Sequence, residues 1–155
     1  MEAAASGLTL GFPHNAIIIA VGAVILDETD RVLLVKHVPQ RRSFWHGKWI
    51  CPGGRLQVGE AIEAGVRREV WEETHLHIRL TRPLVPFERI IHDASGVRLH
   101  VIYIDYLAEK SGGQLQPADD VGEAIWVPRG RLATLGDALH EDTRRLLELA
   151  QVLEG

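Results

Sequence analysis

The chain has 155 residues, 46% of them hydrophobic and 25% charged, which suits one folded domain and excludes an intrinsically disordered chain. Its formal net charge of −4 provides no basic surface for following a nucleic-acid backbone, so a nucleic-acid polymer is not an expected partner. Cys51 is the single cysteine, which excludes an internal disulfide and fits a reducing, cytoplasmic setting.

The first half of the chain reads as a lead-in, a hairpin and a loop. Residues 1–14 are small and irregular and predict a loose lead-in, which lacks the Lys and Arg of a signal peptide. The apolar run 16–26 is too short to cross a membrane as a helix, and its Ile and Val content predicts a strand. Turn residues at 27–30 lead into a second strand, 31–38, so we expect a hairpin. Residues 39–48 then form a basic, aromatic loop.

The second half of the chain surrounds one central helix with strands. The run 49–54 predicts a short strand entering a glycine turn, and apolar residues four apart predict a helix over 61–74. Pro83 and Pro86 favour extended backbone over 80–91. The remaining expected elements are a turn at 93–96, a strand at 97–108, a loop at 110–120, a strand at 123–128, and a helix at 141–155 packing through Leu146, Leu149, Ala150 and Leu153. The fold class is therefore α/β, in a single domain over 1–155.

The central helix carries a crowded group of acids. Glu69, Glu72 and Glu73 are three and four positions apart, so they share one helical face. Like charges this close destabilise a helix unless a cation relieves them. A solvated face with Arg67 and Arg68 as partners is one interpretation, and a divalent cation is the other. Carboxylate oxygens suit Mg²⁺ or Mn²⁺ better than Zn²⁺.

The residues upstream favour the metal site. The run "GGRLQVGEAIEAGVRREVWEETHL" resembles the Nudix (MutT-like) hydrolase signature, and eight of nine signature positions agree. His75 stands where the signature has its last glycine, a residue expected to end the helix in the left-handed conformation. The nine positions are Gly54, Glu60, Arg68, Glu69, Val70, Glu72, Glu73, His75 and Leu76.

The resemblance implies a Nudix α/β/α sandwich with a mixed sheet and a catalytic loop-helix. It also implies metal-dependent hydrolysis of a nucleoside diphosphate linked to another group, with water attacking phosphorus. Glu69 is the first choice of general base, with Arg68 orienting it and Glu60 holding the loop to the helix. Acids of the late loop, Asp119, Asp120 and Glu123, are the alternative bases. The expected metal ligands are Gly54, Glu69, Glu72, Glu73 and Asp120.

Substrate contacts are expected from the loop and the strands around the signature. Arg41, Arg42 and Arg55 could meet phosphates, while Phe44 and Phe87, or else Trp45 and Tyr103, could stack on a base. The segment 87–109 resembles the subgroup of ADP-ribose pyrophosphatases and broad nucleoside-diphosphate hydrolases. A hydrolase of GDP-sugar type that attacks carbon and a catalytically silent nucleotide-sensing domain are the alternatives. The resemblance implies a small-molecule nucleotide as partner, no membrane, and a possible homodimer.

Overall fold

The structure is a computed structural model that describes residues 16–154. Within that range the strands form one seven-stranded mixed sheet in the order β4-β6-β1-β2-β7, with β3 paired to β1 and β5 paired to β6. The β1–β6 pair is parallel, whereas β1–β2 and β2–β7 are antiparallel. The strands are β1 (Ile18–Leu26), β2 (Arg31–His37), β3 (Gly53–Arg55), β4 (Leu76–Pro83), β5 (Phe87–Asp93), β6 (Gly96–Gly113) and β7 (Val121–Pro128).

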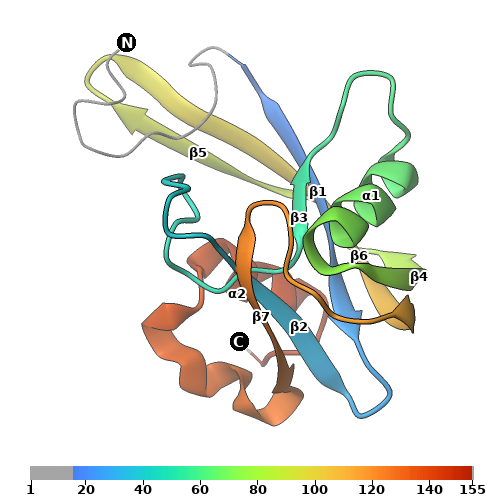
Figure 1. The fold of residues 1–155 in the computed structure, drawn as a ribbon. Helices are drawn as coiled ribbons and strands as arrows, with labels where there is room; N and C mark the ends of the chain where they lie inside the picture. The colour runs from blue at the N-terminus through green and yellow to red at the C-terminus, as the bar shows by residue number, and fades with distance from the viewer. Residues whose placement is uncertain (1–15, 155) are drawn as a thin grey trace.

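Helices cover both faces of this sheet (Figure 1). On one face, Val66 and Val70 of α1 (Ile62–Thr74) pack with Val21 and Ile25 of β1. On the other face, α2 (Glu141–Leu149) packs Leu146 and Leu147 against Val24 and Leu34. Alternate residues of β1 therefore face opposite layers, as the two-residue period of a strand requires. This is the expected α/β/α sandwich.

The hairpin and the central helix follow the sequence prediction. β1 and β2 pair antiparallel across a turn in which Asp27 Oδ1 accepts hydrogen bonds from the backbone N–H groups of Thr29 at 3.0 Å and Arg31 at 2.9 Å. The helix expected over 61–74 begins at Ile62 and ends at Thr74. The expected lead-in, 1–14, lies outside the described residues. No helix in the described part of the chain is long and apolar enough to cross a membrane.

The segment 80–91, predicted to be extended, contains the end of β4 and the start of β5, which are separated by residues 84–86. Two other predicted boundaries are wrong. The loop expected from residue 110 begins later, because Gly112 and Gly113 continue β6 by pairing with His77 and Leu76. Tertiary pairing overrides the turn composition of "KSGG" there. The last helix, expected to reach 155, ends at Leu149. A 3₁₀ segment, η2 (Arg129–Ala138), precedes it.

Candidate active site

The helix that carries the acids ends at His75, where the signature has glycine. His75 adopts the left-handed conformation, with φ 58° and ψ 28°, and its N–H donates to Trp71 O at 2.9 Å. Its ring stacks on Trp71 with centroids 4.9 Å apart. The expected helix end is therefore confirmed without a glycine, and the ring contact offsets part of the strain of this conformation.

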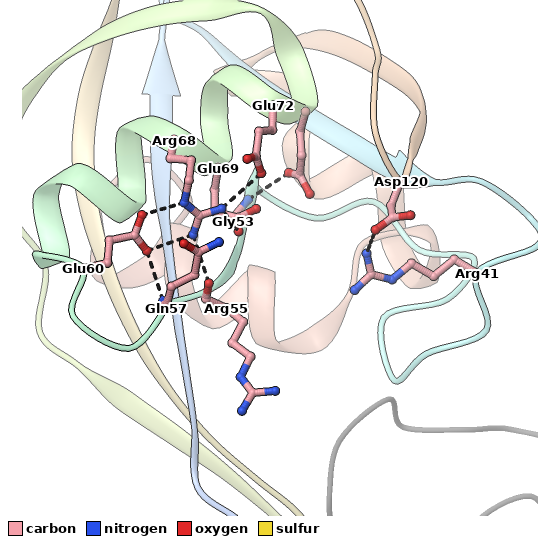
Figure 2. A network of polar contacts seen from close by, with 10 residues as sticks. Arg41, Gly53, Arg55, Gln57, Glu60, Arg68, Glu69, Glu72 and Asp120 are labelled. Atoms are coloured by element: carbon pink, nitrogen blue, oxygen red, sulfur yellow. Dashed lines mark hydrogen bonds and ion pairs between the residues drawn. The ribbon is translucent and has the colours of Figure 1, made fainter.

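Arg68 ties the helix to the loop that precedes it. Its Nε donates to Glu60 Oε2 at 2.5 Å and its Nη2 to Glu60 Oε1 at 2.9 Å, while the Gln57 N–H donates to Glu60 Oε1 at 3.0 Å (Figure 2). Arg68 Nη2 also reaches the carbonyl of Arg55 at 3.1 Å. The hydrogen bonds from Arg68 hold the pKa of Glu60 at about 2. Glu60 thus lies where the sequence placed it, between the loop and the helix.

The crowded acids share this one guanidinium. Arg68 Nη1 donates to Glu69 Oε2 at 2.8 Å and to Glu72 Oε1 at 3.1 Å. Glu72 is half-exposed, but Glu69 is 91% buried in the helix face that meets the sheet. Burial raises the pKa of Glu69, and its contacts with Arg68 oppose that rise. The repulsion is therefore only partly relieved by protein groups.

Glu73 and the glycine turn meet at the same place. The Gly53 N–H donates to Glu73 Oε1 at 3.0 Å, and burial raises the pKa of Glu73 well above its ordinary value. A Cβ on Gly54 would lie 2.5 Å from the carboxyl carbon of Glu69 and 2.7 Å from its Oε2. The glycines of β3 thus let the backbone approach the two buried acids without a side chain between them.

These groups offer the donors that a hard divalent cation prefers. Glu69, Glu72 and Glu73 supply carboxylate oxygens, and Gly54 lies against one of them. Among residues 16–154, however, no three His, Cys, Asp or Glu side chains converge as a metal group, because Arg68 and the Gly53 N–H hold the glutamates. The residue types fit the cation, and coordination by all three acids requires their side chains to turn.

A cavity of about 260 Å³ opens from the glycine turn and runs along the α2 side of the sheet. Arg41 and Arg55 line it, as do the aromatic residues Trp45 and Tyr103, which the sequence analysis considered as base-stacking residues. Further lining residues come from all parts of the fold: Ile18, Ala20, His37, Cys51, Gly53, Gly54, Glu69, Glu73, Asp105, Asp119, Asp120, Thr143 and Leu146.

Three of the residues expected to bind substrate lie elsewhere. Phe44 packs edge-on against Trp45 and His140, with ring centroids 5.4 Å and 4.8 Å away. Phe87 stacks on Tyr103 at 4.7 Å within the α2-side core, behind the cavity wall. Arg42 is exposed and is not among the lining residues. Phe44 and Phe87 are therefore half-buried rings that pack beside the cavity residues Trp45 and Tyr103 and do not line the cavity themselves.

The late-loop acids lie at the cavity but apart from the glutamate network. Asp120 forms an ion pair with Arg41, 79 positions away in the chain, and Figure 2 shows the pair away from Arg68 and Glu72. Asp119 also lines the cavity and adopts a left-handed backbone conformation with φ 56°. Asp120 is therefore held by Arg41, with no glutamate as its partner. Glu123 is exposed on β7, outside the lining.

Sequence reasoning missed Asp105 in the cavity wall and Asp142, which holds the cavity residue Tyr103. Asp105 is 92% buried on β6 and lines the cavity, and burial raises its pKa to about 7. Asp142 of α2 accepts a hydrogen bond from the Tyr103 hydroxyl at 2.5 Å and is ion-paired with Arg89, while Trp45 Nε1 donates to the same hydroxyl at 3.0 Å. The alternation that places Val101 and Tyr103 on one face also places Asp105 there, which was the available signal.

Known proteins resemble this chain in sequence and in structure. A family profile described as NUDIX domain matches residues 17–149. The human "8-oxo-dGDP phosphatase NUDT18" is 35% identical over 83% of this chain and 37% of its own length. The "ADP-ribose pyrophosphatase" of Methanocaldococcus jannaschii is 32% identical over 72% of this chain and 62% of its own. In both cases the chain spans less than two thirds of the relative's length.

Solved structures share the fold. The crystal structure of a MutT protein from Methanosarcina mazei Go1 superposes with a TM-score of 0.72 at 26% identity, covering 88% of this chain and 94% of that one. The NUDIX domain of Shewanella oneidensis NrtR, crystallised with ADP ribose, superposes with a TM-score of 0.67 at 23% identity, covering 97% of each chain. The profile match, the curated relatives and these structures agree, and the chain belongs to the Nudix family.

Proposed function

We propose that this chain hydrolyses the pyrophosphate bond of a nucleoside diphosphate linked to another group, with water attacking phosphorus. The observation that carries the proposal is the set of buried acids on α1 facing the glycine turn at one end of the cavity. Glu69 and Glu73 line that cavity together with Gly53 and Gly54. Two relatives support the reaction class by their names, an 8-oxo-dGDP phosphatase and an ADP-ribose pyrophosphatase.

In this proposal Glu69, Glu72 and Glu73, with the Gly54 carbonyl, hold Mg²⁺ or Mn²⁺. Such a cation neutralises phosphate charge and lowers the pKa of the attacking water. Arg68 positions Glu69 through its 2.8 Å contact, and Glu60 positions Arg68. Arg41 and Arg55, at the cavity wall, would meet phosphate oxygens.

Glu69 is the proposed general base. It lies beside Gly54 at the end of the cavity, and its raised pKa brings it closer to neutral pH than an exposed glutamate. Asp119 is the alternative base, because it lines the same cavity from the late loop. Asp120 would take that role, or a place as metal ligand, only after leaving its ion pair with Arg41.

We also propose a cellular location, a ligand size and an oligomeric state for this chain. We expect a cytoplasmic protein acting on a small nucleotide, and a homodimer, which light scattering on the purified chain would test.

The decisive experiment is a substrate panel with Mg²⁺ or Mn²⁺, combined with one matched pair of variants. ADP-ribose, 8-oxo-dGDP, nucleoside triphosphates, dinucleoside polyphosphates and nucleotide sugars are incubated in ¹⁸O-labelled water, and the products are identified. Glu72→Gln should lower turnover by at least about a hundredfold, because it removes one metal-binding carboxylate. Glu63→Gln is the control, since Glu63 lies on the same helix and pairs with Arg67.

Each outcome has one interpretation. Label in a phosphate product supports attack at phosphorus, and label on a sugar carbon would identify the alternative chemistry. Equal loss of activity in both variants would contradict a special role for Glu72. An inactive wild-type chain that still binds nucleotides would identify a sensing domain in place of an enzyme.

A further inference from the structure

Asp105 is a buried acid in the cavity wall that lacks a partner. The side chain is 92% buried, and its Oδ2 has no hydrogen-bond partner among the described residues. It lines the same cavity as Glu69, Glu73 and Tyr103. Most buried carboxylates in proteins are paired or hydrogen-bonded, so an orphaned one requires an explanation.

The surrounding backbone is shaped to leave room for this side chain. Asp105 is in register with Gly22 on the neighbouring strand β1, and Gly22 is in register with Gly53 on β3. A Cβ on Gly22 would lie 2.9 Å from Asp105 Oδ1 and would overlap the carbonyl oxygen of Pro52. The bare glycine therefore permits the acid to sit between the sheet and the cavity.

Nearby polar groups do not neutralise it. The Tyr103 hydroxyl donates to Asp142 and accepts from Trp45, so it is engaged away from Asp105. Burial raises the pKa of the Cys51 thiol, and the negative charge of Asp105 raises it further, so the thiol stays neutral and supplies no counter-charge. Asp105 Oδ2 is thus left without a hydrogen-bond partner at a cavity, which is typical of a group that binds a ligand.

The position of Asp105 in the cavity indicates which part of a nucleotide it would contact. A phosphate beside Asp105 would be repelled by its carboxylate. Phosphates have a better place at the α1 end, where the acids can hold a cation. Trp45 and Tyr103 also line this cavity, and Ala20 lies in register with Tyr103, so this part of the lining suits an uncharged, ring-containing group.

We propose that Asp105 is a specificity-determining residue that accepts a hydrogen bond from the nucleoside portion of the substrate. The donor is an uncharged N–H of the base or O–H of the sugar. The inference rests on the proposed nucleotide site and deepens it, because it assigns the nucleoside to the Asp105 region of the cavity and the pyrophosphate to the α1 end.

The test measures binding by isothermal titration calorimetry with the full chain and Mg²⁺. The probes are the uncleavable α,β-methylene diphosphates of adenosine and guanosine, with methylenediphosphonate as the phosphate-only probe. At pH 8, where Asp105 is ionised, Asp105→Ala should weaken binding of the nucleoside probe that binds best to the wild type by about tenfold to a hundredfold, as expected for a lost hydrogen bond to a charged group. Its affinity for methylenediphosphonate should stay unchanged. Glu28→Ala, a truncation of an exposed acid in the turn between β1 and β2 and outside the cavity lining, should change neither.

Two further arms identify the donor and guard against misfolding. The 2′-deoxy analogue removes a sugar hydroxyl, and the inosine analogue removes a base amino group. The analogue that binds more weakly to the wild type, but not to Asp105→Ala, identifies the group that donates to Asp105. Thermal midpoints at pH 8 should be equal to or above the wild type in Asp105→Ala and Asp105→Asn. A merely structural residue would instead lower the midpoint and leave nucleotide affinity intact, which would overturn the proposal.

The remaining outcomes distinguish the proposed role of Asp105 from the proposed hydrolytic function on which it rests. Equal nucleoside affinity in wild type and Asp105→Ala, with Glu72-dependent hydrolysis intact, would overturn only the role of Asp105. A loss shared equally by the nucleoside probes and methylenediphosphonate would do the same, since it would place Asp105 in the phosphate site. A wild-type chain that neither binds nor hydrolyses any nucleotide would overturn both proposals.

Discussion

The orphaned acid of the cavity makes a quantitative prediction about stability and pH. Burial raises the pKa of Asp105 from 3.8 to about 7. The folded chain therefore holds this proton between roughly pH 4 and pH 7, where the unfolded chain releases it, so the stabilisation is full below pH 4 and is lost as the pH rises through 7. The complete shift corresponds to about 4 kcal/mol, and more than half of it falls between pH 5 and pH 8.

Asp105→Asn removes the titration and keeps the shape of the side chain. The free energy of unfolding of the variant should exceed that of the wild type by a margin that grows by about 2–3 kcal/mol from pH 5 to pH 8. Urea denaturation followed by tryptophan fluorescence at several pH values measures this difference. Glu28→Gln, in the exposed turn between β1 and β2, is the control and should follow the wild type at each pH. A difference that stays constant with pH would refute the view of Asp105 as a buried, unpaired acid.

Three other substitutions test the site at single positions. Gly54→Ala should lower metal-dependent turnover by about a hundredfold while the fold persists, because its Cβ would displace the Glu69 carboxylate, and steady-state kinetics with circular dichroism would show this. His75→Val should lower the free energy of unfolding by about 1–2 kcal/mol, since a β-branched residue resists the left-handed conformation, whereas His75→Gly should stay within about 1 kcal/mol of the wild type. Tyr103→Phe should destabilise the chain by about 1–3 kcal/mol in urea, because it removes the hydroxyl that donates to Asp142. Unchanged stability in that variant would show that Arg89 alone satisfies Asp142.

Local chemistry was enough to predict the elements that carry the site. The apolar spacing of Val66 and Val70 predicted the helix, and the turn residues around Asp27 predicted the hairpin. The helix end at His75 followed from the place of a missing glycine. β6 was predicted too short, since the pairing of Gly112 with His77 is a tertiary fact that "SGG" does not reveal.

The features that could not be predicted depend on contacts between residues that are distant in the chain. Phe44 and Phe87 were equal to Trp45 and Tyr103 as candidates, and only the fold decides which rings face the cavity and which are covered. The ion pair between Arg41 and Asp120 joins two residues that the sequence placed in separate roles. The position of Asp105 within a strand could be predicted from the sequence. That its Oδ2 lacks a hydrogen-bond partner depends on the residues packed around it in the fold.

β6 changes its pairing partner along its length. Its first part pairs with β5 up to the partners Phe87 and Tyr103, and its later part pairs with β4 from the partners Pro83 and Tyr106. Asp105 lies at this change of partner, where the Leu84 N–H still donates to its carbonyl at 2.9 Å.

The segment 84–86 that makes this change touches neither α1 nor the glycine turn of β3 through any strand pairing within the described chain. Because the Leu84 N–H donates to the Asp105 carbonyl, a change in the length of this connector would alter the backbone beside Asp105 without replacing any glutamate of α1.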